Sequence, residues 1–95
     1  MKQVNEHQEE CLNILQEECA EVIQAASKIK RFGLVGKRID SETNLKHMET
    51  ELGDVLALID IVIDSGLGLT VEGIEQAKKA KFDRLSQYMH TWEIK

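Results

Sequence analysis

The sequence predicts an all-α protein with three main helices. Apolar residues recur at steps of three and four over long stretches, as they do along one face of an α-helix. Glycine pairs interrupt this pattern twice, at Gly33 and Gly36 and again at Gly66 and Gly68. No stretch keeps the period of two that a strand requires, and none offers a second strand for pairing. At 95 residues, the chain has the size of a single domain, and we expect one over residues 1–95.

The first helix is expected from about Val4 to Arg31. Gly33 and Gly36 mark its end and open a short basic loop, GLVGKRID. Cys11 lies eight residues from the next cysteine, about 12 Å along one helix, so no disulfide joins the two. We expect both thiols to be reduced and buried. The apolar stripe of this helix consists of Leu12, Leu15, Cys19, Val22, Ala26 and Ile29.

The second helix is expected to begin at an N-cap residue, Asp40 or Ser41, and to run to Ser65. Glu42 then lies favourably near the positive end of the helix dipole. The apolar residues of this second helix are Leu45, Met48, Leu52, Val55, Leu56, Ile59, Val62 and Ile63. They extend a single helical pattern across the β-branched run, which excludes a strand there.

The third helix is expected over residues 70–90, with Thr70 as its N-cap. The aliphatic stem of Lys81 belongs to its inner face. That face consists of Val71, Ile74, Ala77, Lys81, Leu85 and Tyr88 or Met89.

Composition and charge exclude several classes of partner. The formal net charge is −5, which disfavours nucleic acid. The N-terminus has no apolar segment typical of a signal peptide, and the longest aliphatic run, residues 55–63, is too short to span a bilayer. We therefore expect a cytoplasmic protein with no membrane partner.

Carboxylates lie beside the apolar stripes of the first two helices. Glu18 falls at the edge of the first stripe, and Glu21 lies about 60° further round the helix. On the second helix Glu51 falls inside the apolar arc, with Asp54 about 60° outside it. Each helix therefore offers two carboxylates at spacing i, i+3 along one edge of its core face. Glu17 lies further towards solvent.

If the two helices pack together, these four carboxylates converge. Two unit charges 4 Å apart repel by about 4 kcal/mol at an effective dielectric constant near 20. Such a cluster must hold protons, keep its members apart or bind a cation, and an all-oxygen set suits Mg²⁺ or Mn²⁺. The Glu-x-x-His motif of ferritin-like di-iron sites does not occur. From geometry alone, solvated surface glutamates remain the alternative.

The carboxylate motifs resemble those of a known superfamily. E-E-x-x-E at residues 17–21, followed by E-x-x-D at residues 51–54 within ELGDVLALI, is similar to the signature of the MazG-like all-α nucleoside triphosphate pyrophosphohydrolases. This superfamily includes the dimeric dUTPases and the phosphoribosyl-ATP pyrophosphohydrolases. The resemblance covers residues 12–64 well and the third helix in general character only.

The resemblance implies an activity and a set of site residues. The expected reaction is hydrolysis of the α–β phosphoanhydride of a (deoxy)nucleoside triphosphate to a monophosphate and pyrophosphate, with Mg²⁺ as cofactor and Mn²⁺ as a substitute. Glu17 corresponds to a residue that helps to bind metal or orient water, and all five carboxylates are candidate catalytic residues. The implied metal ligands are Glu18, Glu21, Glu51 and Asp54.

Basic residues supply candidates for phosphate binding. Lys28 continues the edge of the first helix that carries Glu21, and we expect only two or three cations to touch phosphate, because a solvated face accounts for most of them. GLVGKR lacks two spacer residues and the Ser/Thr of a phosphate-binding P-loop. Phe32 and Trp92 are candidates for stacking on a base, although packing is the commoner role. The cation candidates are Lys28, Lys30, Arg31, Lys37, Arg38, Lys78, Lys81 and Arg84, of which Lys28, Arg31, Lys78, Lys81 and Arg84 are preferred.

A single helical hairpin cannot cover both aliphatic edges of the second helix. We therefore expect a homodimer or tetramer in which a second chain completes a four-helix-bundle-like core. Lys78, Lys81 and Arg84 then reach the site from the neighbouring chain. Two other functions stay open: a narrower enzyme of the same superfamily, acting on dUTP, dCTP, phosphoribosyl-ATP or a modified nucleotide, and a non-catalytic helical module whose acidic edge binds a basic partner.

Overall fold

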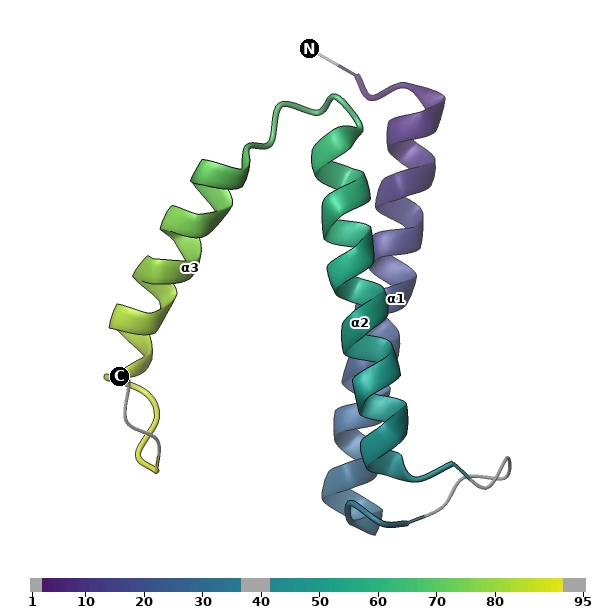
Figure 1. Ribbon diagram of the computed structural model, residues 1–95, viewed down its shortest axis with the longest axis vertical. Helices are drawn as coiled ribbons and strands as arrows, with labels where there is room; N and C mark the ends of the chain where they lie inside the picture. The colour runs from purple at the N-terminus through teal and green to yellow at the C-terminus, as the bar shows by residue number, and fades with distance from the viewer. Residues whose placement is uncertain (1–2, 37–41, 92–95) are drawn as a thin grey trace.

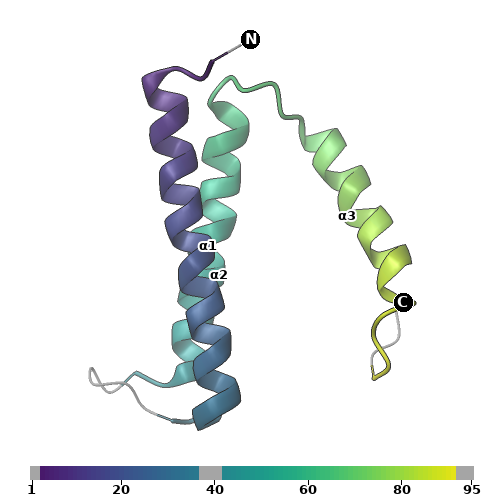
Figure 2. The same ribbon diagram turned by 180° about the vertical axis from the view of Figure 1, so that it is seen from behind.

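The computed structural model describes residues 3–36 and 42–91, and this part of the chain contains three helices. They are α1 (Glu6–Phe32), α2 (Asn44–Asp64) and α3 (Val71–Leu85). The all-α prediction is confirmed. In both ribbon views α1 and α2 lie side by side as an antiparallel hairpin, whereas α3 leans away from it (Figures 1 and 2). Only α1 and α2 pack extensively against each other.

The start of α1 is fixed by a capping box. Asn5 Oδ1 accepts a hydrogen bond from the Gln8 backbone N–H at 2.8 Å, and Gln8 Oε1 accepts one from the Asn5 backbone N–H at 3.0 Å. The Gln8 side chain also donates to the Ser65 carbonyl at 3.1 Å. The same glutamine therefore ties the start of α1 to the end of α2.

The opposite end of the hairpin is closed by Asn44. Gly33 ends α1 with a φ of 86° and donates its N–H to the Ile29 carbonyl. The buried Asn44 side chain donates to the Gly33 carbonyl at 3.0 Å, and the Asn44 backbone N–H donates to the Gly36 carbonyl at 2.9 Å. The first residue of α2 is therefore held directly against the last turn of α1.

This contact explains why the expected N-cap of the second helix is wrong. Thr43, and neither Asp40 nor Ser41, caps α2: its Oγ1 accepts a hydrogen bond from the Lys46 N–H at 3.1 Å. Because Asn44 is anchored to α1, the helix begins there and the cap falls on the residue before it. Asp40 and Ser41 lie outside the described residues.

The third helix begins as predicted but ends early. Thr70 Oγ1 accepts from the Gly73 N–H at 2.9 Å, which confirms the cap. The helix stops at Leu85 instead of residue 90, and the chain continues as a turn in which the Tyr88 N–H bonds the Leu85 carbonyl. No residue of α3 is buried. Without packing, there is little to stabilise a further helical turn.

The seam between α1 and α2 follows a heptad-like pattern on each helix. The expected stripe on the first helix is rotated relative to this seam. Cys11 and Ala25 are buried in it, whereas Cys19 is exposed, so the expectation of two buried thiols is wrong for Cys19. On α1 the seam consists of Gln8, Cys11, Leu15, Glu18, Val22, Ala25 and Ile29, and on α2 of Asn44, Met48, Glu51, Val55, Leu58, Val62 and Ser65, all buried or half-buried.

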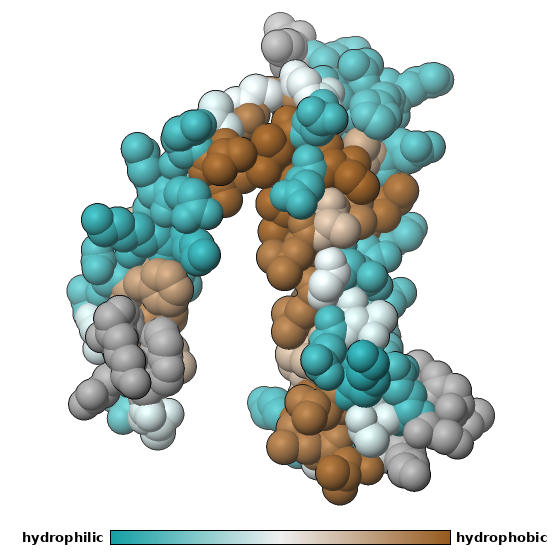
Figure 3. Space-filling model, in the orientation of Figure 1, coloured by the Kyte–Doolittle hydropathy of each residue, from teal (hydrophilic) through white to brown (hydrophobic). Residues whose placement is uncertain are grey.

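A second apolar stripe on α2 remains uncovered. It lies about 100° round the helix from the seam, and we call it the outer stripe. Figure 3 shows apolar surface along the side of α2 that faces α3. Leu45, Leu52 and Leu56 are 48%, 45% and 65% exposed. The full outer stripe is Leu45, Leu52, Leu56, Ile59 and Ile63.

Candidate metal centre

Three carboxylates from two helices meet in the middle of the hairpin. Glu18 comes from α1, and Glu51 and Asp54 come from α2. Each offers one carboxylate oxygen, and these three oxygens lie within 4.8 Å of one another. Glu18 and Glu51 occupy seam positions where an apolar side chain would normally pack. On α1, for example, Glu18 falls between the seam residues Leu15 and Val22.

Two oxygens of this cluster have no partner. Glu51 is only 5% exposed. Glu18 Oε2 and Glu51 Oε2 are both buried and neither has a hydrogen-bond partner. Burying an unpartnered carboxylate oxygen costs free energy, and such groups are rare in folded proteins. Packing of the two helices therefore does not by itself explain why these two oxygens are buried.

Burial and mutual repulsion favour protonation of the cluster. Burial, a side-chain hydrogen bond with Glu21 and the nearby charges of Glu21 and Asp54 raise the pKa of Glu51 to about 7. Burial, followed by the charge of Asp54, also raises the pKa of Glu18 above its ordinary value. The causes agree with the geometry, since each carboxylate has others as its nearest charged neighbours.

The remaining two candidate carboxylates lie at the margin of the cluster. Glu21 is exposed and hydrogen-bonds Glu51, but its oxygens are not part of the group of three. Glu17 is also exposed, and its negative charge contributes to the raised pKa of Glu18. The structure thus brings Glu18, Glu51 and Asp54 together and places Glu21 and Glu17 beside them.

The residues present fit a hard divalent cation. All candidate ligand atoms are carboxylate oxygens, the type that Mg²⁺ and Mn²⁺ prefer. In octahedral coordination at 2.0–2.1 Å, opposite ligands are about 4.2 Å apart. Only one pair of three ligands can be opposite, and adjacent ligands are about 2.9 Å apart. The three oxygens lie within 4.8 Å of one another, so side-chain rotations that draw them together would complete the site. The two unpartnered oxygens are acceptors that such an ion would satisfy.

A family model described as the MazG nucleotide pyrophosphohydrolase domain matches residues 6–88. The chain belongs to this family. The match extends the resemblance beyond the two motif-bearing helices to the whole of α3. Neither a curated protein nor a solved structure matches the chain. Members of the MazG family generally depend on a divalent metal, in keeping with the acidic cluster.

Within the described residues, no helix is long and apolar enough to cross a membrane.

One residue next to the cluster of this MazG domain was missed in the sequence. His47 lies one turn before Glu51 on α2, with its Nδ1 3.6 Å from Glu51 Oε1. The imidazole is largely buried, with 14% of its side chain exposed. The signal that indicates it is the i, i+4 spacing from a glutamate at a core position.

The basic residues of the MazG domain divide into two groups. Lys28 is half-buried on α1, the helix that carries Glu18 and Glu21. Arg31 is exposed, with its guanidinium 4.9 Å from the centroid of the Phe32 ring, so Phe32 stacks on a cation. Lys30 is exposed beside it. The three candidate cations of α3, Lys78, Lys81 and Arg84, are exposed, as is the neighbouring Lys79.

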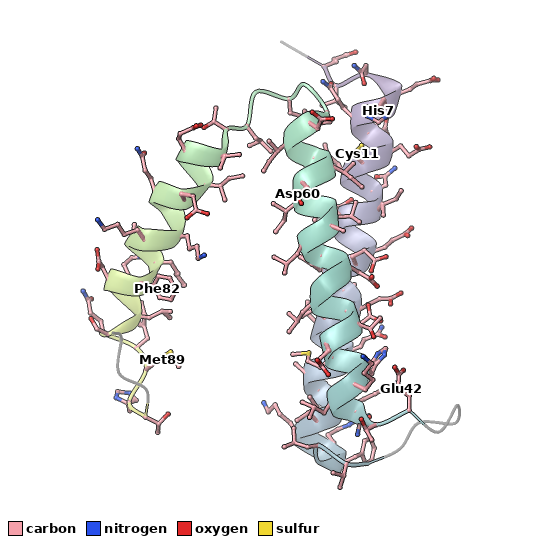
Figure 4. The ribbon with its side chains drawn as sticks, in the orientation of Figure 1. His7, Cys11, Glu42, Asp60, Phe82 and Met89 are labelled. Atoms are coloured by element: carbon pink, nitrogen blue, oxygen red, sulfur yellow. The ribbon has the colours of Figure 1, made fainter. Side chains whose placement is uncertain are left out.

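The cations of α3 are not gathered at the carboxylates within one chain. Figure 4 shows α3, which carries Phe82, standing apart from α2, which carries Asp60. Among the three described helices, α3 makes no more than a weak contact with the other two. Lys37, Arg38 and Trp92 lie outside the described residues.

Proposed function

We propose that this MazG-family chain, acting as one domain over residues 1–95, hydrolyses the α–β phosphoanhydride of (deoxy)nucleoside triphosphates to a monophosphate and pyrophosphate. Mg²⁺ is the proposed cofactor, and Mn²⁺ a substitute. The observation that carries the proposal is the pair of buried, unpartnered oxygens, Glu18 Oε2 and Glu51 Oε2, beside Asp54. A bound cation offsets the folding cost of these oxygens, and few other ligands do so.

The carboxylates have distinct proposed roles. Glu18, Glu21, Glu51 and Asp54 hold the cation, which when bound neutralises phosphate charge and lowers the pKa of water. Glu17, on the solvent side of Glu18, orients the attacking water. A carboxylate not engaged with the ion accepts the proton that the water loses. Addition of water across the P–O–P bridge then gives the two products.

The cations stabilise the leaving group. Pyrophosphate gains negative charge as the bridge breaks, and positively charged side chains near it lower the barrier. Lys28 and Arg31 supply such charge from α1. Lys78, Lys81 and Arg84 supply it from α3 of a neighbouring chain, because α3 leans away from its own hairpin.

Assembly into a homodimer, or a tetramer of two dimers, is part of this proposal. The outer stripe of α2 leaves a row of aliphatic side chains exposed. A second hairpin covers it and completes a four-helix arrangement with the outer stripe at its centre. The acidic cluster lies on the other side of the seam, so this contact does not block it.

The dimensions of one chain support this assembly. Its radius of gyration is 16.4 Å, against about 12.4 Å for a compact chain of this length. It exposes 7767 Å², whereas a compact monomer of 10.8 kDa exposes about 5,500 Å². The excess, roughly 2,200 Å² per chain, is in the range that obligate dimers bury.

The test is hydrolysis of a panel of nucleoside triphosphates with Mg²⁺, with the products resolved by chromatography. The expected products are the nucleoside monophosphate and pyrophosphate. Nucleoside diphosphate and orthophosphate as primary products would overturn the proposed cleavage position. Turnover confined to dUTP, dCTP or phosphoribosyl-ATP would narrow the substrate class. Metal binding without turnover of any nucleotide would instead favour a helical interaction module.

A further inference from the structure

Besides Glu21, His47 also contacts Glu51, the most buried carboxylate of the cluster, from outside the group of three. Its Nδ1 is 3.6 Å from Glu51 Oε1, while Glu51 Oε2 has no partner. The two oxygens of one carboxyl group thus have different surroundings. One faces an imidazole, and the other belongs to the buried side of the cluster.

The surroundings of this contact distinguish it from an ordinary surface ion pair. Only 14% of the His47 side chain and 6% of the Glu51 side chain are exposed. Exposed pairs contribute little because water competes for both partners, whereas desolvated ones hold their geometry. His47 and Glu51 are also both on α2, one turn apart, so the helix backbone sets their separation.

We propose that His47 is a positioning residue for the metal centre. Its Nδ1–H holds Glu51 Oε1 and so directs Oε2 towards Glu18 and Asp54. The 3.6 Å separation exceeds a hydrogen bond of 2.7–3.2 Å, and a small rotation of either side chain closes it. Outer partners of metal-binding side chains commonly act in this way. The inference rests on the proposed metal centre.

His47 is a partner of a ligand and not a ligand itself. The group of residues that offer atoms within 4.8 Å of one another contains Glu18, Glu51 and Asp54, and His47 is not a member. His47 Nδ1 lies near Glu51 Oε1, whereas the oxygen without a hydrogen-bond partner is Glu51 Oε2. The role is therefore orientation of a carboxylate, which affects the affinity for the ion.

Three substitutions separate the contact made by Nδ1 from simple packing. In His47→Asn the amide nitrogen can take the place of Nδ1, in His47→Gln it takes the place of Nε2, and His47→Leu has no donor. Affinity for Mn²⁺ is measured by titrating the ion against the melting temperature of the full chain. We expect His47→Leu and His47→Gln to bind Mn²⁺ about tenfold more weakly or worse, and His47→Asn to stay close to the parent.

His7→Leu is the matched control. His7 also lies one turn from a side chain that it contacts, with its Nε2 3.6 Å from Cys11 Sγ near the start of α1 (Figure 4). This substitution removes an imidazole from the same hairpin but not from the acidic cluster. Its Mn²⁺ affinity should match that of the parent.

A kinetic readout checks the same point independently. In His47→Leu the Mg²⁺ concentration for half-maximal activity should rise about tenfold, while kcat at saturating Mg²⁺ recovers. Equal Mn²⁺ affinity in His47→Leu and the parent overturns the positioning role and leaves the metal centre intact. Equal weakening in all three variants also overturns it, because packing then accounts for the effect. A parent protein that no Mn²⁺ concentration stabilises would overturn the metal centre itself.

Discussion

Glu18 and Glu51 bury one carboxylate oxygen each, unpartnered, at the same level of the α1–α2 seam. Because both helices place a carboxylate where an apolar residue would pack, the metal-free hairpin is strained electrostatically at its centre. A cation relieves this strain by satisfying both oxygens. Stability and cofactor binding are therefore coupled in the same residues.

The first prediction concerns the loss of one negative charge. Glu51→Gln and Asp54→Asn should raise the melting temperature of the metal-free protein, because repulsion within the cluster falls. The same variants, and Glu21→Gln, should lose turnover by more than the 10–100-fold typical of outer partners. Differential scanning calorimetry and a pyrophosphate-release assay measure the two effects.

Glu49→Gln is the control for this charge change. Glu49 is exposed on α2, so its neutralisation should alter neither metal-free stability nor activity. Turnover at the parental rate in Asp54→Asn would remove Asp54 from the proposed site.

The second prediction concerns pH. The pKa of Glu51 is raised to about 7, above the value of about 4.3 for an unfolded glutamate. Between these values the folded state binds more protons than the unfolded state, so the stability due to this group falls as pH rises. In metal-free protein the melting temperature should be higher at pH 5 than at pH 8, and Glu51→Gln should flatten the difference.

Saturating Mg²⁺ at pH 8 should restore the stability lost at that pH, because the ion binds the ionised carboxylates. The measurement is thermal unfolding of dialysed protein across pH 5–8, with and without the ion. A parent and a Glu51→Gln variant with parallel pH profiles would contradict the raised pKa.

The third prediction concerns the outer stripe. Leu56→Lys should convert the proposed dimer to a monomer near 10.8 kDa, because a buried, unpaired ammonium at an interface costs several kcal/mol. Ala57→Lys is the control, since Ala57 is exposed and faces away from both apolar stripes of α2. Sedimentation equilibrium distinguishes the species. A monomeric and fully active parent would show that one chain makes the whole site.

The fourth prediction concerns which chain supplies the cations. Asp54→Asn damages the carboxylates, and the double variant Lys78→Ala with Lys81→Ala damages the cations. When the two inactive proteins are unfolded together and refolded as a mixture, each heterodimer regains one intact site if the cations come from the neighbouring chain. About a quarter of the parental activity should return. If each chain uses its own cations, every site in the mixture carries a defect and no activity returns.

The fifth prediction concerns the closure between α1 and α2. Asn44→Ala removes the hydrogen bond to the Gly33 carbonyl and should destabilise the protein by about 1–3 kcal/mol. Asn13→Ala, at an exposed position of α1, should change stability by less than about 0.5 kcal/mol. Urea unfolding at one fixed chain concentration compares them. Equal stabilities would show that the Asn44 side chain is dispensable.

Helix existence and several boundaries could be predicted from local pattern. Glycines ended two helices where expected, and Gly66 and Gly68 have φ values of 87° and 105° that favour glycine. The Thr70 cap is equally local. The N-cap of α2 was missed because a tertiary contact, from Asn44 to the end of α1, decides where that helix begins.

It was harder to predict which face of each helix packs against the other, because the seam includes a carboxylate of the site. α2 has two apolar stripes, and periodicity does not reveal which one α1 covers. On α1 the seam contains Glu18, so hydropathy favours a stripe rotated towards Cys19, which is exposed. The convergence of carboxylates was nevertheless accessible, because the spacing of Glu18, Glu51 and Asp54 follows from helical geometry. The spacing of His47, one turn before Glu51, was also accessible, whereas the side-chain conformations that bring its Nδ1 to 3.6 Å from Glu51 Oε1 were not.

The hydrogen bond from Gln8 to Ser65 and the one from Asn44 to Gly33 close the two ends of the hairpin, with the carboxylates between them. An apolar heptad pattern alone allows one helix to shift along its neighbour by seven residues, because apolar side chains then face apolar side chains again. Buried polar groups remove that freedom, because each finds its partner in one alignment only. Slipped hairpins would leave Asn44 and Gln8 unpaired against aliphatic side chains. These terminal contacts therefore select the alignment in which Glu18 and Glu51, thirty-three positions apart in the chain, meet at the same level.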